Sequence, residues 1–314
     1  MRLKKLVVIG TEDAGLAGIG KVHPPIFFPN FSAALSRLDV TVETYETVQD
    51  FKATAPQEEA VVLLIYNEER LTVPAVMSEV LLAHRLAQEK FSNVLVIHPP
   101  EQGLVISNKI TTLERLGGTG CDVPKRILAG RSAKTFSHEF YGSGHKAVLS
   151  DVAEAGKHNV QFIDTRQTVA DRDYFICLRA MAVGAECISC FVRAKDAQAG
   201  DPVVHNSDTP KDPLMLNELH ERLVRPNWRA FVEICRKVEA AIGFGMFAID
   251  ILPCRATGNF YVCEVNIKLE EFGMRSILNL VRPQLTYGAE CDQHYPERAA
   301  HALFQGVRRK GFWW

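Results

Sequence analysis

No stretch of this 314-residue sequence stays apolar over the ~18–20 residues that a membrane-spanning helix needs. An excess of either charge is also absent, because the formal net charge is −1 at pH 7. This balance gives no global field that would attract nucleic acid or an anionic membrane. The basic and aromatic end GVRRKGFWW is predicted to be a short solvated tail. We therefore expect neither a nucleic-acid partner nor a membrane partner.

The sequence also gives little support for a signal peptide or a zinc site. The opening MRLKKLVVIG has an apolar part of only about five residues and lacks a small-residue cleavage site, so a first β-strand explains it better. Eight cysteines are scattered along the chain, and Cys187 and Cys190 form a CxxC. On a strand, residues three apart point to opposite faces, and no second CxxC follows. We expect free thiols in a reduced, cytoplasmic protein.

What the sequence does contain is ample material for a core, since 47% of its residues are hydrophobic. In the first hundred residues, short apolar runs at 6–10, 61–66 and 93–100 predict buried strands of a parallel sheet. The segment 73–88 between the last two predicts a crossover helix. The glycine-rich stretch GTEDAGLAGIG does not fit the GxGxxG spacing of a dinucleotide loop, so we interpret it as a plain loop.

The remaining two thirds alternate apolar segments with glycine-rich and polar breaks. Helical patterns and strand patterns both occur here, and loops separate them. The predicted elements are a helix at 108–116, a strand in GGTGCDVPKRIL, a glycine-rich turn within 138–156, a strand at 159–164, a hairpin at 173–194 turning at 183–185, a polar loop at 194–226, and a helix at 227–243 with Asn227 as its N-cap.

The hairpin FAIDILPCRATGNFYVCEVN, residues 247–266, carries the most unusual polar residues. Strand alternation places Glu264 and Asn266 on one face and Cys263 on the other, and a turn near Gly258 would bring Asp250 beside the pair. Unpaired carboxylates between apolar flanks are strongly disfavoured. A magnesium ion would remove the conflict, because it prefers oxygen ligands and commonly bridges phosphates. The alternative is a half-exposed hairpin with one polar face.

Two further features are suited to binding anions. The turn YGSGHKAV can present backbone N–H groups to a phosphate, although a simple hairpin turn has the same composition. Arg179 and Arg193 interrupt the apolar runs on the two arms of the 173–194 hairpin. Each guanidinium is either a paired structural charge or a clamp for phosphate or carboxylate.

Taken in order, these segments resemble the ATP-grasp superfamily of carboxylate–amine ligases, in particular the branch of glutamate ligases that modify a ribosomal protein. The resemblance runs from about residue 106 to 266. It rests on ISNKITTLERLGGTGCDVPKRI, on the flap FYGSGHKAVLSDVAEA, on the hinge VQFID, on the arginine hairpin LRAMAVGAECISCFVR, and on FAIDIL followed by YVCEVN.

The resemblance implies a role for each matching residue. Arg179 and Arg193 would be catalytic and hold the reacting carboxylate. One or two Mg2+ ions, which Mn2+ could replace, would be bound by Asp250, Glu264 and Asn266. The implied ATP-binding residues are Lys109, His138, Gly142, Ser143, Gly144, Lys146, Gln161, Phe162, Ile163 and Asp164.

The chain departs from the family pattern at His138, where relatives have a lysine that contacts ATP. A histidine with an ordinary pKa of about 6.5 is partly charged at neutral pH, so we expect ATP affinity to fall between about pH 6 and 8. Lys134 and Lys146 are the alternative cations. The segment between Lys125 and Gly142 is also short, which indicates a trimmed lid.

The resemblance therefore implies an α/β protein with a Rossmann-like N-terminal parallel sheet followed by a two-part ATP-grasp module. The expected domains are 1–105, a small central lid subdomain at 106–160, and 161–314. The implied activity is ATP-dependent coupling of a carboxylate to an amine through an acyl phosphate, with small substrates or a peptide as partners. A homodimer is the usual assembly for such an enzyme. The alternatives are a degenerate module that binds nucleotide or a partner without turnover, and a phosphotransferase.

Overall fold

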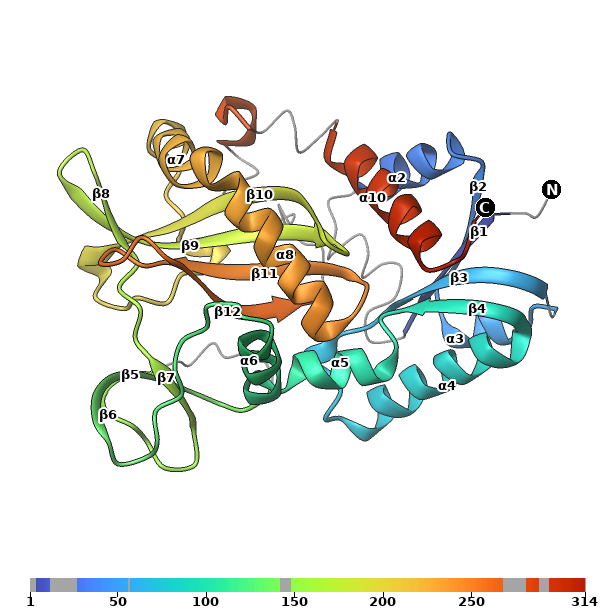
Figure 1. Cartoon of the computed structure of the whole chain (residues 1–314), viewed down its shortest axis with the longest axis horizontal. Coiled ribbons are helices and arrows are strands. Elements are labelled where there is room, and N and C mark those ends of the chain that lie inside the picture. Colours follow the sequence, from blue (N-terminus) through green and yellow to red (C-terminus); the bar gives the residue numbers. More distant parts are fainter. Residues whose placement is uncertain are drawn as a thin grey trace.

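The computed structural model describes residues 4–11, 27–55, 57–141, 148–267, 281–287 and 294–313. Within them, three β-sheets occur in succession along the chain (Figure 1). The first sheet is parallel and the other two are antiparallel. The expected α/β class, with a parallel N-terminal sheet followed by antiparallel sheets, is therefore confirmed. The expected domain boundaries stay a prediction.

The parallel sheet has the strand order β2-β1-β3-β4 among the described residues. The three strands and the crossover helix predicted from apolar runs are all present. The runs of β1 and β3 are buried on both faces of the sheet, and that of β4, at its edge, is half-buried. The shorter elements between residues 27 and 52 were not predicted. The elements are β1 (Lys4–Gly10), α2 (Phe27–Ser36), β2 (Val40–Tyr45), α3 (Val48–Lys52), β3 (Gln57–Ile65), the 3-10 turn η1 (Glu68–Arg70), α4 (Pro74–Lys90) and β4 (Phe91–Ile97).

His98 joins this sheet to the rest of the molecule. It is buried, and its Nε2 accepts a hydrogen bond of 3.2 Å from the backbone N–H of Met246. Its Nδ1 lies 2.9 Å from Oε1 of Gln102, whose amide group donates to the carbonyls of Ile242 and Phe244. Because Nε2 accepts, Nδ1 carries the proton and the ring is neutral. The contact fixes Met246, the first residue of β11 (Met246–Pro253), the strand that carries Asp250.

Two helices lead from the first sheet to the second. They are α5 (Pro100–Ser107) and α6 (Lys109–Gly118), and the side chain of Asn108 caps α6 by accepting the Thr111 N–H at 3.0 Å. The prediction of a strand in GGTGCDVPKRIL is wrong, because this segment forms only an isolated bridge from Arg126 to Val160. The three-stranded sheet, in the order β6-β5-β7, follows. Its strands are β5 (Ser132–His138), β6 (Val148–Val152) and β7 (His158–Gln161).

The second antiparallel sheet is the centre of the molecule and has the order β10-β9-β11-β12, with β8 also paired to β9. Both predicted hairpins are present in it. Gly184 and Gly258 make their turns with φ of 55° and 74°, a left-handed conformation that glycine adopts without a steric penalty. The strands are β8 (Arg166–Val169), β9 (Arg172–Val183), β10 (Glu186–Asp196), β11 (Met246–Pro253) and β12 (Phe260–Asn266).

Helix α8 (Trp228–Ile242) lies across this sheet and packs on β10 (Figure 1). It confirms the predicted helix at 227–243, and Phe231, Ile234 and Val238 form its buried face. Asn227 stands at the N-cap, but its side chain makes no capping bond and donates to the Leu223 carbonyl instead.

Two loop predictions were wrong. The segment 194–226 contains short 3-10 turns, α7 (Pro213–Leu219) and the π-helical turn η4 (His220–Val224). The end of the chain is not a solvated tail. It continues from α10 (Tyr295–Arg309), which packs beside α2, and Trp313 is 2% exposed and stacks on Phe304. No helix in the described ranges is long and apolar enough to cross a membrane.

Candidate active site

A cavity of about 400 Å³ lies where the two antiparallel sheets, the start of α6 and the turn η1 meet. Both polar and apolar side chains line it. The charged and polar lining residues are Glu69, Lys109, His138, His158, Gln161, Thr165, Arg179, Arg193, His205, Asp250, Glu264 and Asn266. The structure thus brings together ten of the residues predicted from the sequence, since Phe162 and Ile163 also line the cavity.

Four predicted residues, Gly142, Ser143, Gly144 and Lys146, lie outside the described residues, so the phosphate flap stays a prediction.

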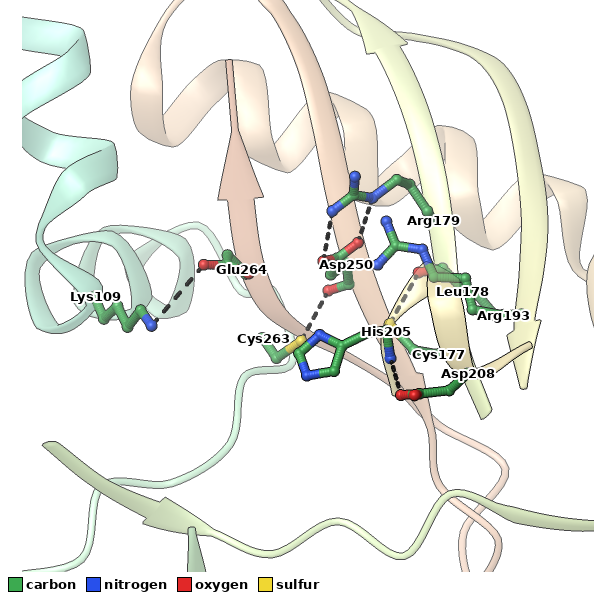
Figure 2. Close-up of polar contacts among 10 residues, drawn as sticks. All are labelled: Lys109, Cys177, Leu178, Arg179, Arg193, His205, Asp208, Asp250, Cys263 and Glu264. Carbon is green, nitrogen blue, oxygen red and sulfur yellow. Dashed lines mark hydrogen bonds and ion pairs between the residues drawn. The ribbon is translucent and has the colours of Figure 1, made fainter. Parts of the chain in front are cut away.

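Asp250 is held between two arginines. Arg179 on β9 is its direct cross-strand partner, with Nε–Oδ1 and Nη2–Oδ2 distances of 2.8 and 2.9 Å. Nη1 of Arg193 on β10 lies 3.4 Å from Oδ2 of Asp250 (Figure 2). Burial by itself would raise the pKa of the Asp250 carboxyl, but the two guanidinium charges hold it below its usual value. Asp250 is therefore ionised at neutral pH.

Arg193 is only partly satisfied by this contact. Its side chain is 6% exposed. Its Nε and Nη2 are buried and have no hydrogen-bond partner among the described residues. An unsatisfied buried donor of a charged group carries a large desolvation penalty. Arg193 lines the cavity, and its Nε and Nη2, which have no partner among the described residues, are suited to an anion such as a carboxylate or phosphate.

Glu264 lies on the other side of Asp250, paired to it in the β11–β12 register. Its Oε1 is 4.0 Å from Nζ of Lys109, the first residue of α6 (Figure 2). Burial, followed by the charge of Asp250, raises the pKa of the Glu264 carboxyl, and Lys109 and Arg179 only partly oppose this. The negative charge of Glu264 is thus incompletely compensated in the folded chain.

A β-bulge changes which side chains of β12 reach the cavity. Asp250 pairs with Glu264 but Ile251 pairs with Val262, so Cys263 is an extra residue on β12. The sequence predicted Cys263 on the face opposite Glu264, by simple alternation. That prediction is wrong, because the bulge brings both side chains into the cavity lining, and the Cys263 thiol donates to the Asp250 carbonyl at 3.4 Å.

The donor set fits a magnesium ion in its chemistry. Asp250, Glu264 and Asn266 offer two carboxylates and an amide oxygen in one cavity, which suits a hard cation. The uncompensated charge of Glu264 is a second point in favour, because a cation would relieve it. Within the described ranges, no three His, Cys, Asp or Glu side chains form a metal-binding group. A metal here would therefore need the Asn266 oxygen and ligands from a bound substrate.

His138 and His158 are paired neighbours on β5 and β7. Burial, and then the charge of Lys109, lowers the pKa of His138 to about 3 and that of His158 to about 4. The expectation that His138 is partly charged at neutral pH is therefore wrong for the unliganded chain, because a desolvated imidazole beside a lysine favours its neutral form. The Nδ1 atoms of both rings are buried and have no hydrogen-bond partner in the part of the chain that is described.

The predicted adenine hinge is only partly in the cavity wall. Gln161, Phe162 and Ile163 line the cavity, but Asp164 does not. The Asp164 carboxylate instead forms two hydrogen bonds, of 2.9 and 2.6 Å, with the guanidinium of Arg166. Lys134 is also outside the cavity lining, and its Nζ lies 4.6 Å from the centre of the Phe162 ring. It therefore packs against the hinge from outside the cavity.

Sequence reasoning missed four polar residues of the cavity, namely Glu69, His158, Thr165 and His205. His205 ends the lining segment 202–205 that follows β10, and Lys195 holds this segment through Asp201 at 3.0 Å and the Val203 carbonyl at 3.1 Å. Glu69 belongs to η1 of the first sheet. No local pattern marks these residues, because they reach the cavity from separate elements.

Comparisons with known proteins bear on the fold. No family model matches the chain, and no curated protein sequence is significantly similar to it. The solved structure of the ATP-grasp ligase PsnB complexed with a phosphomimetic variant of its minimal precursor, Mg and ADP is similar, with a TM-score of 0.53 and 12% identity over 98% of this chain and 99% of that chain.

Two further solved structures are similar. The complex of PsnB with precursor peptide PsnA2 and AMPPNP has a TM-score of 0.52 and 12% identity over 97% of this chain and 98% of that chain. A putative ATP-grasp superfamily protein from Archaeoglobus fulgidus has a TM-score of 0.51 and 16% identity, covering 93% of this chain and 88% of its own. This chain has the ATP-grasp fold.

Proposed function

We propose that this protein is an ATP- and Mg2+-dependent ligase that couples a carboxylate to an amine. The observation that carries the proposal is Arg193, whose Nε and Nη2 are buried in the cavity region without a partner among the described residues. Beside it, Asp250, Glu264 and Asn266 offer the oxygen donors of a metal site in the same cavity. Unsatisfied cationic donors next to a set of metal ligands suit a carboxylate and a polyphosphate that meet there.

The reaction has two steps. A carboxylate oxygen attacks the γ-phosphorus of ATP, the bond to the β-phosphate oxygen breaks, and ADP leaves. The amine nitrogen then attacks the carbonyl carbon of the acyl phosphate, inorganic phosphate leaves, and the nitrogen loses a proton. Lys109 and the arginines stabilise the charge on the transferring group by position and electrostatics, without a covalent enzyme intermediate.

Asp250, Glu264 and Asn266 would hold one or two Mg2+ ions, for which Mn2+ could substitute, and the metal would neutralise phosphate charge and orient the reacting groups. Gln161, Phe162 and Ile163 would contact the adenine. The similar structures of PsnB contain a precursor and either Mg and ADP or AMPPNP. They support a peptide as one candidate for the carboxylate or amine substrate here, beside small molecules.

The test is ATP-dependent trapping of an activated carboxylate. The protein is incubated with ATP, Mg2+, hydroxylamine and a panel of N-acetyl amino acids and short peptides, and both ADP and hydroxamate are measured. We expect equimolar ADP and hydroxamate with at least one carboxylate, and loss of both in Glu264→Gln. Glu233→Gln, which makes the same change on the exposed side of α8, serves as the control.

Nucleotide binding with neither product in the wild type would refute the ligase and leave a module that binds without turnover. A phosphorylated product that hydroxylamine does not trap would identify a phosphotransferase instead.

A further inference from the structure

Glu69 reaches the cavity from the N-terminal parallel sheet and not from the sheets that carry the arginines. It lies in η1, just after β3, and its side chain lines the cavity. Its backbone N–H donates to the Asn67 side chain at 3.2 Å, which orders the turn. Its carboxylate forms no hydrogen bond or ion pair with any described residue. Glu69 is thus an acidic group that has no cation partner among the described residues, in a cavity lined by both polar and apolar side chains.

The turn that carries Glu69 is held rigidly on α5. The hydroxyl of Tyr66 donates to the Pro99 carbonyl at 3.2 Å. Gly103 permits this contact, since a Cβ at that position would lie 2.3 Å from the Tyr66 hydroxyl and 2.8 Å from Cδ1 of Leu71. Tyr66 and Leu71 are buried on either side of η1. The backbone at Glu69 is therefore positioned before any ligand binds, which favours a recognition role.

No residue has yet been assigned to binding the amine substrate in the cavity. Lys109, Arg179 and Arg193 are cations and suit phosphate and carboxylate groups. An amine substrate is an ammonium ion at neutral pH and needs an anionic acceptor. Asp250 is already bound by both arginines, and Glu264 belongs to the proposed metal set.

The charge of Glu69 also acts on Glu264, one of the proposed metal ligands. Its charge adds to burial and to Asp250 in raising the pKa of Glu264. Among the described residues, Lys109 and Arg179 only partly oppose this effect. A positively charged ligand bound at Glu69 would lower the repulsion between Glu69 and Glu264.

We propose that Glu69 binds the ammonium group of the second substrate, so that the amine acceptor is a primary amine that is positively charged in solution, such as a free amino acid, a peptide N-terminus or a lysine side chain. This inference rests on the proposed ligase function. It makes the N-terminal sheet part of the acceptor site, in the same cavity as the arginines that hold the carboxylate. Glu69 determines specificity for the acceptor, and the activation step does not depend on it.

The test separates the two half-reactions with two nucleophiles. Hydroxylamine is uncharged at neutral pH and needs no anionic acceptor, whereas glycinamide and the free amino acids are largely cationic. With the carboxylate identified by hydroxamate trapping, ADP release is measured as a function of amine concentration. We expect Glu69→Gln to raise the KM for the cationic amine about 10- to 100-fold, the range for a lost hydrogen bond to a charged group. Hydroxamate formation should change less than about twofold.

Glu101→Gln is the matched control, because it removes the same charge from the exposed face of α5 outside the cavity lining. It should leave both reactions unchanged. Glu69→Asp keeps the charge but shortens its reach, and should raise the KM by an intermediate factor. If Glu69→Gln does not fold, the KM of Glu69→Asp is used to test the inference instead.

Two results would overturn the inference alone. One is an unchanged KM for every cationic amine in Glu69→Gln. The other is an equal loss of hydroxamate formation, which would assign Glu69 to the nucleotide or metal site. Absence of ADP and hydroxamate in the wild type with every carboxylate would instead overturn the ligase function, and the inference with it.

Discussion

Arg179 on β9 and Asp250 on β11 are direct cross-strand partners, and their side chains form two hydrogen bonds of 2.8 and 2.9 Å. Both side chains are nearly buried, at 12% and 9% exposure. Asp250 thus stabilises the sheet as well as being a candidate metal ligand. A buried ion pair of this kind is strongly destabilised when one partner is removed, because the other charge stays buried without compensation.

We expect Asp250→Asn to lower the free energy of unfolding by about 3–5 kcal/mol, because it leaves Arg179 and Arg193 without their counter-charge. Glu264→Gln should leave it unchanged or slightly higher, because the ionised form of Glu264 is disfavoured in the fold. Both variants should lose Mg2+-dependent turnover. Urea unfolding at pH 7 measures the difference, and equal stability of the two variants would contradict the structural role of Asp250.

The second prediction concerns Arg193. Arg193→Lys keeps a positive charge but loses the planar set of donors that the cavity leaves unsatisfied. We expect kcat for hydroxamate formation to fall about 100-fold or more while the Kd for ATP changes only a few-fold, since the group acts mainly on the reacting carboxylate. Arg236→Lys on the exposed side of α8 is the control. A large and equal loss of ATP affinity would place Arg193 on the nucleotide instead.

The third prediction is that His138 contributes no pH dependence to ATP affinity, in contrast to the expectation from the sequence. With a pKa of about 3, His138 is neutral in the free protein from about pH 6 to 8. ATP binding can therefore be linked to protonation of His138 in this range only if the bound triphosphate raises its pKa by about three units. We expect wild type and His138→Gln to show superimposable ATP affinities from pH 6 to 8 in titration calorimetry. A steeper fall of ATP affinity with rising pH in the wild type would show that His138 becomes protonated when ATP binds.

The fourth prediction concerns acid stability. The pKa of the buried His98 is lowered from 6.5 to about 4 by burial. Its stabilising contribution is therefore complete above the unfolded pKa and is lost as the pH falls from about 6.5 through about 4, by on the order of 3 kcal/mol. Protonation would also set Nε2–H against the Met246 N–H that now donates to it.

Urea unfolding of wild type and His98→Gln at pH 7 and pH 4.5 tests this. We expect the wild type to lose more stability than His98→Gln between these values. His301→Gln, on the exposed face of α10, should behave like the wild type. Parallel losses in wild type and His98→Gln would mean that another group carries the acid sensitivity.

Strands and helices with a strong local pattern were predictable. The hairpins at 173–194 and 247–266 and the helix at 227–243 are present because their apolar residues are buried by neighbours on the same or an adjacent strand or helix. α7 and the C-terminal segment were missed for the opposite reason. Leu216 and Leu219 are buried where α7 packs on β8 and β10, and Trp313 is buried where the end of the chain folds back onto Phe304 of α10. Neither contact is marked by a local periodic pattern.

In the site, too, some features were predictable from the sequence and others were not. The sequence alone determined which residues could act there, because Asp250, Glu264, Asn266 and the two arginines interrupt apolar strands, where a polar side chain needs a partner. Their pairing was decided only in three dimensions. The strand register sets Arg179 against Asp250, and one bulge brings Cys263 into the cavity beside Glu264.

The tertiary structure also decided which residues belong to the site and whether His138 is protonated. Burial beside Lys109 makes His138 neutral, which no property of its local sequence indicates. The turn after β3 adds Glu69 from a sheet whose sequence shows no site pattern. Desolvation and charge interaction depend on distances between segments that are far apart in the chain, and only the folded arrangement sets those distances.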